Sequence, residues 1–334
     1  MKEKVLETSN SGDFSKPRRF NTSMKSFLKK SVPMSLVLLI TFNSTLGVAI
    51  IQYYFYRSQV NALIAYKEKL NEELENTPEK QAQRLEVAVL PEGGVVLPVK
   101  WGDVGTKLVS VGVIDQQKFL SLFRGGPLSK ANADYTKILT TNYDEAIVLT
   151  RENSRFVLNA LWALGLAQQS LVLEDMRSEY PQVENLAATG GWNLAQGSAM
   201  DHYGKHNLFN LSPEQQVLIK QIASNIYRPC CNNHTAFADC NHGMAMLGLI
   251  EMMVAKGYSE DEIYNSALAV NSIWFPDTYL TIAKYMEDER NLEWAAVVAK
   301  EVLGAEFSSG SGYRSVLAKV KPVQGSGGGG GCGV

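Results

Sequence analysis

The sequence predicts a mainly α-helical protein with an N-terminal transmembrane helix, a helical stalk and one globular, mostly helical extracytoplasmic domain that carries a short extended arm. Three observations predict this class. A long uncharged apolar segment lies near the N-terminus, apolar residues recur at helical spacing through most of the chain, and several periodic segments begin with helix-capping sequences. We expect five parts: a basic cytoplasmic tail over 1–33, the transmembrane helix over 34–56, the stalk over 57–86, the helical domain over 87–324 and a Gly-rich tail over 325–334.

The composition excludes several classes of protein. Of 334 residues, 45% are hydrophobic and 20% are charged, which is typical of a folded chain rather than a disordered one. The formal net charge of −2 gives no general attraction to nucleic acid, so we expect no nucleic-acid partner. Four cysteines are too few for a disulfide-rich secreted scaffold. The sequence contains neither a phosphate-binding loop of the G-x-x-x-x-G-K type nor a G-x-S-x-G nucleophile elbow.

The transmembrane prediction rests on the segment from Met34 to Tyr56. No charged residue occurs between Val32 and Tyr56, and most side chains there are apolar. A helix of 23 residues is roughly 35 Å long, which exceeds the roughly 30 Å hydrocarbon core of a bilayer. The polar residues from Thr41 to Thr45 are compatible with a span, because Ser and Thr hydroxyls can bond to helix carbonyls.

The flanking charges predict the orientation of this span. Residues 1–33 carry eight Lys and Arg against three Asp and Glu, and a positively charged flank stays in the cytoplasm. We therefore expect a single-pass protein of the cell membrane, with lipid contacts over 34–56, a cytoplasmic N-terminus and export of the chain after Arg57. The alternative is a cleaved signal peptide, but the long lead-in and the long span argue against it.

The next two segments differ in character. Residues 57–86 have apolar side chains at the spacing of an amphipathic helix, namely Val60, Leu63, Ile64, Leu70 and Leu74. Such a stripe can pair with a second copy, so a homo-oligomer through the stalk is one expectation, although two heptads are short for a coiled coil. Residues 87–101 contain β-branched residues, prolines and a Gly-Gly pair, which favour a short extended hairpin or arm.

Most of the remaining chain is expected to be helical. Two helices begin with capping boxes, Ser212-Pro213-Glu214-Gln215 and Ser259-Glu260-Asp261-Glu262. The segment 153–171 is nearly all apolar, so we expect it at the centre of a single core. The full set of expected helices covers 103–111, 115–123, 153–171, 212–227, 239–255, 259–271, 276–287 and 292–303, whereas 134–150 is ambiguous between helix and strand.

The residues capable of metal or redox chemistry concentrate in one segment. All four histidines and three of the four cysteines lie between His202 and His242, and the inner part has the spacing CC-x2-H-x5-C-x-H. Thiolates and imidazoles together fill a tetrahedral zinc site or a lower-coordinate Cu(I) site. The predicted cofactor is therefore a Zn or Cu ion, with Cys230, Cys231, Cys240 and His242 as ligands and His234 as a replaceable fifth.

The expected helix over 239–255 would change the chemistry of two of these ligands. Cys240 and His242 should lie in its first turn, where the helix dipole lowers the pKa of a cysteine.

Other interpretations of the same residues stay open. Cys230 and Cys231 can act as a thiol–disulfide oxidoreductase pair, with Cys240 or Cys332 as the resolving thiol. Alternatively, Cys240 forms a disulfide with Cys230 or Cys231 that only staples a loop on the oxidising side of the membrane. His202 and His206 are further ligands, a proton relay or plain surface groups.

Cys332 lies in the tail Gly325–Val334, which has the sequence GSGGGGGCGV. This tail cannot fold alone, because glycine pays the largest ordering entropy and offers no side chain to bury. A thiol on so flexible an arm can reach the 230–242 segment and accept a metal or exchange a disulfide there. We therefore expect a partner protein that donates or accepts a metal or a thiol.

Two resemblances add to these expectations. The chain resembles an uncharacterised family of single-span bacterial membrane proteins that have a CC…DCNHG segment and a Gly-rich Cys tail. The resemblance lies in Leu97–Asp103, Thr189–Trp192, Ile226–Glu251, Trp274–Asp277 and the terminal Gly-Gly-Cys-Gly-Val. That resemblance brings no known activity.

The second resemblance is local and covers residues 215–277. It is to the CcmH-type thiol oxidoreductases of cytochrome c maturation, whose motifs match Arg228–Cys231 and Gly257–Ile263. That family separates its two cysteines by two residues, whereas Cys230 and Cys231 are adjacent. The resemblance implies thiol exchange.

The function that the sequence favours is binding or transfer of zinc or copper by an anchored extracytoplasmic protein. A thiol–disulfide oxidoreductase and a structural envelope protein with a disulfide staple are the alternatives.

Overall fold

The structure is a computed structural model that describes residues 32–75, 77–123 and 136–323. It divides into two units, of which the first ends at Leu74 and the second begins at Glu75. Helices dominate, and the strands found among the described residues form one two-stranded sheet. The mainly α-helical class is confirmed.

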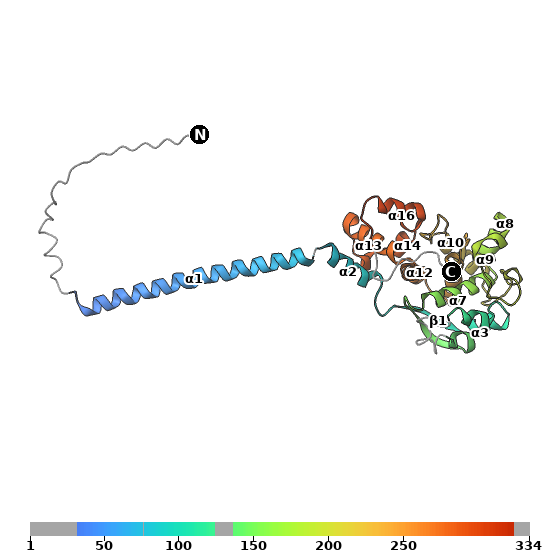
Figure 1. Cartoon of the computed structure of the whole chain (residues 1–334), viewed down its shortest axis with the longest axis horizontal. Helices are drawn as coiled ribbons and strands as arrows, with labels where there is room; N and C mark the ends of the chain where they lie inside the picture. The colour runs from blue at the N-terminus through green and yellow to red at the C-terminus, as the bar shows by residue number, and fades with distance from the viewer. Residues whose placement is uncertain (1–31, 76, 124–135, 324–334) are drawn as a thin grey trace, which may run out of the picture. The chain divides into compact units, whose positions relative to one another are not determined.

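The described part of the first unit is almost entirely one unbroken helix, α1 (Met34–Glu75), which is drawn in blue in Figure 1 and whose last residue begins the second unit. It is the one helix among the described residues that is long and apolar enough to cross a membrane, and it fits a single-pass membrane protein. The hydroxyls between Thr41 and Thr45 are all hydrogen-bonded within the helix. Oγ1 of Thr41 donates to Val37 O at 2.9 Å, and the hydroxyls of Ser44 and Thr45 likewise donate to backbone carbonyls of the preceding turn.

The predicted stalk helix is interrupted before residue 86. Residues 78–86 belong to a separate helix, α2 (Pro78–Val89), because Pro78 cannot donate the hydrogen bond that would continue α1. Thr77 caps the new helix by accepting a hydrogen bond from the Lys80 amide at 3.3 Å. Within the second unit, α2 packs against α13 (Pro276–Arg290), where Arg84 pairs with Glu287.

The extended arm is a strand, β1 (Val95–Gly102), and its partner comes from the segment that the sequence left ambiguous. β1 pairs antiparallel with β2 (Tyr143–Leu149), so the arm forms no local hairpin. Alternate side chains of β1, Leu97, Val99 and Trp101, are buried. The short helices on this side of the unit are α3 (Val104–Ser110), α4 (Gln116–Ser121) and α6 (Lys137–Thr140).

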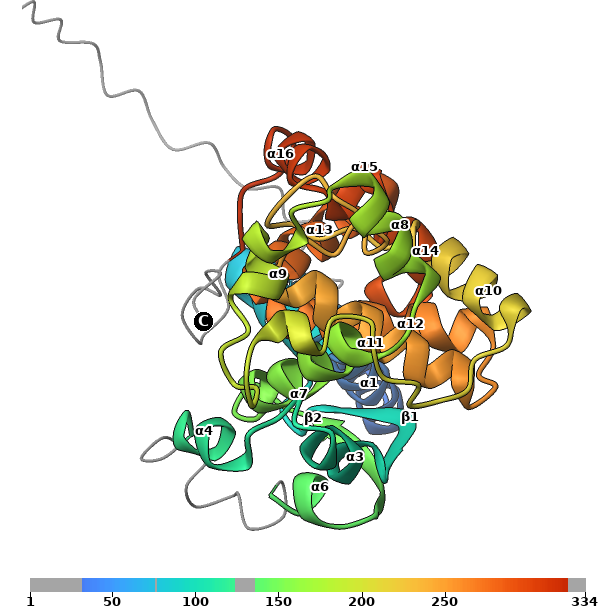
Figure 2. The same cartoon turned by 90° about the vertical axis from the view of Figure 1, so that its right-hand side faces the viewer.

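The centre of the second unit is the contact between α7 (Ser154–Ala167) and α11 (Asn241–Ala255). Figure 2 shows the two helices side by side, with α3 on the α7 side and α12 (Glu260–Trp274) on the α11 side. Two glycines allow this approach: a Cβ on Gly165 would lie 2.0 Å from Met244 O, and one on Gly248 would lie 2.4 Å from Leu161 O. The expected position of the 153–171 helix at the core is confirmed.

Both predicted capping boxes are present. Ser212 caps α10 (Pro213–Ala223) and Ser259 caps α12, and in each case the third helical residue returns a side-chain hydrogen bond to the cap. However, α10 ends at Ala223 rather than near Tyr227. Residues 224–240 therefore form a loop between α10 and α11.

The predicted helix over 292–303 is wrong. Two short turns, η4 (Trp294–Ala296) and α14 (Ala299–Val302), replace it. The β-branched pair Val297-Val298 is extended between them. The remaining elements are α8 (Leu171–Glu179), η2 (Val183–Asn185), α9 (Ala187–Gly190), η3 (Ala199–Asp201), α15 (Ala305–Ser308) and α16 (Gly310–Leu317).

Candidate functional site

The cysteines lie on the 224–240 loop, whose backbone is held by the C-terminal part of the chain. The Tyr227 amide donates to Leu303 O at 2.8 Å, and the Gly310 amide donates to Cys231 O at 2.7 Å. The loop therefore has no regular structure but is anchored just before its cysteine pair and at the second cysteine of the pair.

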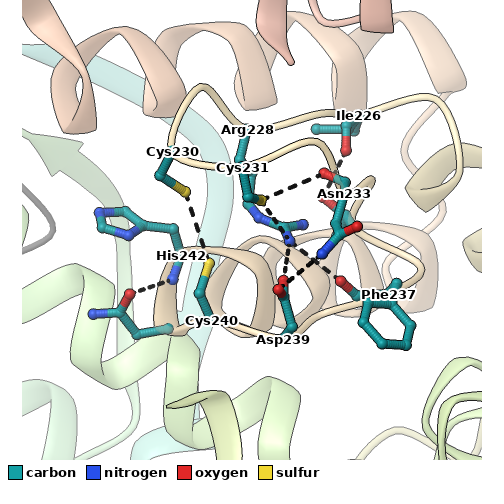
Figure 3. A network of polar contacts seen from close by, with 11 residues as sticks. Ile226, Arg228, Cys230, Cys231, Asn233, Phe237, Asp239, Cys240 and His242 are labelled. Atoms are coloured by element: carbon teal, nitrogen blue, oxygen red, sulfur yellow. Dashed lines mark hydrogen bonds and ion pairs between the residues drawn. The ribbon is translucent and has the colours of Figure 1, made fainter. Parts of the chain in front are cut away.

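Three sulfur atoms meet where this loop enters α11, as Figure 3 shows. The Sγ atoms of Cys230 and Cys240 are 4.0 Å apart, and the Cys231 thiol interacts with both. All three are free thiols; Cys230 is exposed and the other two are partly buried. The structure thus brings together three of the predicted site residues, and we call this set the thiol cluster.

Arg228 places a positive charge against the thiol cluster. Its side chain is 0% exposed, and Nη2 donates to Asp239 Oδ1 at 2.6 Å and to Phe237 O at 3.2 Å. The same Nη2 lies 3.5 Å from Cys231 Sγ, whereas Nε and Nη1 have no hydrogen-bond partner among the described residues. Gly243 in the first turn of α11 makes room for the guanidinium, because a Cβ there would lie 2.7 Å from Arg228 Cζ.

This environment separates the acidities of the neighbouring thiols. Hydrogen bonds from the thiols of Cys230 and Cys240, together with the charge of Arg228, hold the pKa of Cys231 well below the usual value for a cysteine. The pKa of Cys230 is raised, chiefly because its thiol is hydrogen-bonded to Cys231. The arrangement favours one thiolate, on Cys231, next to neutral thiols.

His242 lies in the first turn of α11, as expected, whereas Cys240 is the residue that precedes this helix. The pKa of Cys240 is raised rather than lowered: its hydrogen bond with Cys230 lowers the pKa, but its hydrogen bond with Cys231 and its burial outweigh that effect. The ring of His242 is buried against Phe275 and Trp274, with centroid separations of 4.6 and 5.5 Å. Burial, reinforced by the charge of Arg228, lowers its pKa to about 4, so the ring is neutral at pH 7. Its Nδ1 is buried and has no hydrogen-bond partner among the described residues.

The other predicted site residues stand apart from the thiol cluster. His234 packs edge-on against Tyr227 at 5.7 Å between ring centroids, and no contact found for the described residues joins it to a sulfur. Cys332 lies outside the described residues. His202 and His206 pair with each other, Nδ1 to Nε2 at 3.0 Å, and His202 Nε2 bonds to a backbone carbonyl rather than to a cysteine.

The sequence analysis did not identify Arg228, Asp239 and Asn233, which form a charged frame around the thiol cluster. Asn233 Nδ2 donates to Asp239 Oδ2 at 2.8 Å, so the carboxylate is held between this amide and Arg228. A signal for this frame is present in the sequence: Arg228 and Asp239 are the only Lys, Arg, Asp or Glu residues between Lys220 and Glu251. Two opposite charges that are the only ones in a stretch of this length indicate an ion pair, and a charged side chain is buried only when it is paired.

Among the residues that the structure describes, the side chains form no ready metal site. No group of three or more His, Cys, Asp or Glu side chains there is arranged to hold a metal ion. The zinc or copper site accordingly stays a prediction.

Comparison with known proteins adds no relative. No protein-family model matches the chain, and neither a curated protein nor a solved structure matches it. The two family resemblances therefore stay predictions, and the function has to be argued from the thiol cluster and its surroundings.

Proposed function

We propose that the chain is a membrane-anchored thiol–disulfide exchange protein, in which Cys230 and Cys240 alternate between two thiols and one disulfide. The observation that carries the proposal is the 4.0 Å separation of their sulfur atoms beside Cys231 and Arg228. A disulfide bond is about 2.05 Å long, so the two sulfurs need to approach by about 2 Å. The partner is a protein that presents a disulfide or a dithiol.

The reaction begins at the exposed thiol. As the Cys230 sulfur attacks a disulfide of the partner, its proton passes along the hydrogen bond to the Cys231 thiolate. The partner's S–S bond breaks, a mixed disulfide forms, and the first partner sulfur leaves as a thiolate that takes up the proton from Cys231.

Cys240 completes the exchange. It loses its proton to Cys231, attacks Cys230 Sγ and displaces the second partner sulfur, which leaves as a thiolate and is protonated in turn. Two electrons have then moved from the cluster to the partner, which is reduced to a dithiol while the Cys230–Cys240 disulfide forms. With a dithiol partner the same steps run in reverse.

Arg228 and Cys231 have distinct roles in this scheme. Cys231 passes the proton of each attacking thiol on to the departing thiolate. Its lowered pKa keeps this sulfur ionised at neutral pH, so that it can accept the proton, and makes the proton easy to release again. Arg228 is a positioning residue, since its permanent charge stabilises the thiolate without touching the partner.

The membrane anchor supports such a function. A thiol pair on the outer side of a membrane lies in an oxidising compartment, where disulfides form and persist. The apolar part of α1 and the positive charge of residues 1–33 favour that placement.

The first test maps the disulfide. Full-length protein is equilibrated in glutathione buffers of increasing potential, its thiols are blocked, and its linked peptides are identified by mass spectrometry. We expect a reversible Cys230–Cys240 bond, and we expect Cys332→Ser, the matched control outside the cluster, to leave it unchanged. Thiols that stay reduced in every buffer, or a bond between other cysteines, contradict the proposal.

The second test traps the intermediate. Cys240→Ser should accumulate a mixed disulfide at Cys230 with a disulfide-bonded model peptide, because the resolving thiol is missing. Cys230→Ser should form none at the cluster. Equal trapping in both variants contradicts the assigned roles.

Metal binding is the second candidate, favoured by one observation. His242 offers a neutral ring with a buried, unpartnered Nδ1 on the helix that follows Cys240. Together with the thiol cluster it would give a ligand set of three sulfurs and one nitrogen once the side chains rotate. Metal analysis of protein purified without chelator decides: one zinc or copper per chain, lost in His242→Ala, supports this candidate over exchange.

A further inference from the structure

The part of α1 beyond the apolar span exposes large apolar side chains along one helix. Leu63, Ile64, Tyr66 and Leu70 are 67%, 50%, 65% and 42% exposed. They follow Arg57, which marks the end of the uncharged segment. At about 1.5 Å per residue, Leu63 lies roughly 9 Å and Leu70 roughly 20 Å past Arg57. These side chains therefore extend beyond the hydrocarbon core into water unless something covers them.

The positions of these residues follow a single heptad frame. With Val60 at position a, the a positions are Val60, Lys67 and Leu74 and the d positions are Tyr56, Leu63 and Leu70. Ile64 and Tyr66 then occupy the flanking e and g positions. The b, c and f positions carry no large apolar residue from 58 to 72, since they are Ser58, Asn61, Ala62, Ala65, Glu68, Lys69 and Glu72.

We propose that residues 56–70 form a parallel two-stranded coiled coil with the same residues of a second copy of this chain. Val at a with Leu at d favours two parallel strands, and a single Lys at an a position specifies register and strand number at a cost in stability. Lys67 is that residue. Two copies that cross one membrane with the same topology necessarily run parallel.

The membrane explains how so short a coil can form. Two heptads are marginal in free solution, because helix formation is cooperative and its nucleus is costly. Spans confined to one bilayer meet at a high effective concentration, which raises pairing without any new contact. The inference is independent of the chemistry proposed for the thiol cluster.

The test is a cross-linking scan in the full chain. All four native cysteines are changed to Ser, and a single Cys is placed at a seam position (Leu63→Cys or Leu70→Cys) or at an outer position (Ala62→Cys, Ala65→Cys or Lys69→Cys). Each protein is reconstituted alone in phosphatidylcholine vesicles and oxidised, and the dimer is measured on non-reducing gels. Circular dichroism verifies that all variants have the same helix content.

We expect the seam positions to cross-link on the order of tenfold faster than the outer ones. Lys67→Val should raise the seam rates further, because it removes two like charges that face each other in the seam. Equal rates at all five positions, or no cross-link at any of them, overturn the proposal. So does cross-linking confined to single cysteines within 34–56, which would assign pairing to the membrane span alone.

Discussion

A buried guanidinium keeps its charge, because arginine does not lose its proton in proteins. Arg228 therefore needs negative partners, and the structure supplies the Asp239 carboxylate and the Cys231 sulfur. The charge that would be costly alone adds to the hydrogen bonds of Cys230 and Cys240 in lowering the pKa of the Cys231 thiol. The cysteine spacing shows which sulfurs are near in sequence, but the low pKa of Cys231 comes from the hydrogen bonds of the Cys230 and Cys240 thiols and, after them, from the charge of Arg228.

Arg228→Gln should raise the pKa of the Cys231 thiol, because the positive charge that favours the thiolate is lost. The pKa is measured as the midpoint of the pH dependence of alkylation, located at Cys231 by mass spectrometry. The variant should also lose about 3 kcal/mol of stability, since one partner of a buried ion pair is removed. Arg228→Lys retains the charge and should keep the alkylation midpoint near that of the unaltered protein; equal midpoints in all three proteins would contradict the role of the charge.

Glu251 is a second buried ionisable group, on α11 and away from the proposed chemistry. Its carboxylate has no hydrogen bond of normal geometry among the described residues, and the one polar group that acts on it is the Ser170 hydroxyl, whose interaction partly offsets the effect of burial. Complete burial raises the pKa of Glu251 well above its ordinary 4.5. The side chain is therefore held as the neutral acid in the folded protein over a range of pH in which the unfolded chain is ionised.

Stability should fall as pH rises because of this residue. Between pH 4.5 and the higher folded pKa, the folded state binds one proton more than the unfolded state, so the free energy of unfolding decreases with pH. Glu251→Gln removes this contribution, and the variant should gain stability relative to the unaltered protein as the pH is raised from about 4 to about 8. Urea unfolding at both pH values measures the difference; a difference that does not change with pH argues against an elevated pKa.

The sequence predicted the starts of helices whose capping residues lie close together in the chain, but it did not predict contacts between distant segments. Ser212 and Ser259 cap as predicted because a capping box lies within four consecutive residues. The pairing of β1 with β2 joins distant segments, and the extended Val297-Val298 pair divides an apolar run that looked helical. In the same way, the sequence indicated which cysteines to examine, whereas the position of Arg228 among them depends on the packing of α11.

The α7–α11 contact gives glycine an unusual role within a helix. At an exposed helical position, Gly→Ala stabilises by about 1 kcal/mol. Here the added methyl groups of Gly165→Ala and Gly248→Ala would meet backbone oxygens of the facing helix at 2.0 and 2.4 Å. Backbone cannot rotate away as a side chain can, so the two helices would have to separate.

Each of these two substitutions should therefore lower stability by about 3 kcal/mol, the upper range for overpacking a core. Gly93→Ala is the matched control, because no atom lies within 4 Å of its added methyl group, and it should change stability by less than about 0.5 kcal/mol. Urea denaturation of the three variants measures this. Stabilisation by Gly165→Ala would mean that the helices are not in close contact.

The chain joins a helix suited to a membrane with a second unit that has its own buried core. The sequence predicted the apolar span because the thickness of a bilayer sets the length of apolar helix that is needed to cross it. The thiol chemistry proposed for the second unit depends on which side of the membrane that unit occupies, since a reducing cytoplasm would keep the cluster as thiols.

Thiol labelling in intact cells that express the full chain determines that side. One variant retains only Cys230, the exposed member of the cluster, and a second has no native cysteine but carries Ser11→Cys in the basic N-terminal region. Because the positive flank is expected to stay inside, a membrane-impermeant maleimide should label Cys230 directly. The cysteine at position 11 should react only after the cells are permeabilised. The reverse pattern would place the cluster in the cytoplasm and remove the oxidising environment on which disulfide formation between Cys230 and Cys240 depends.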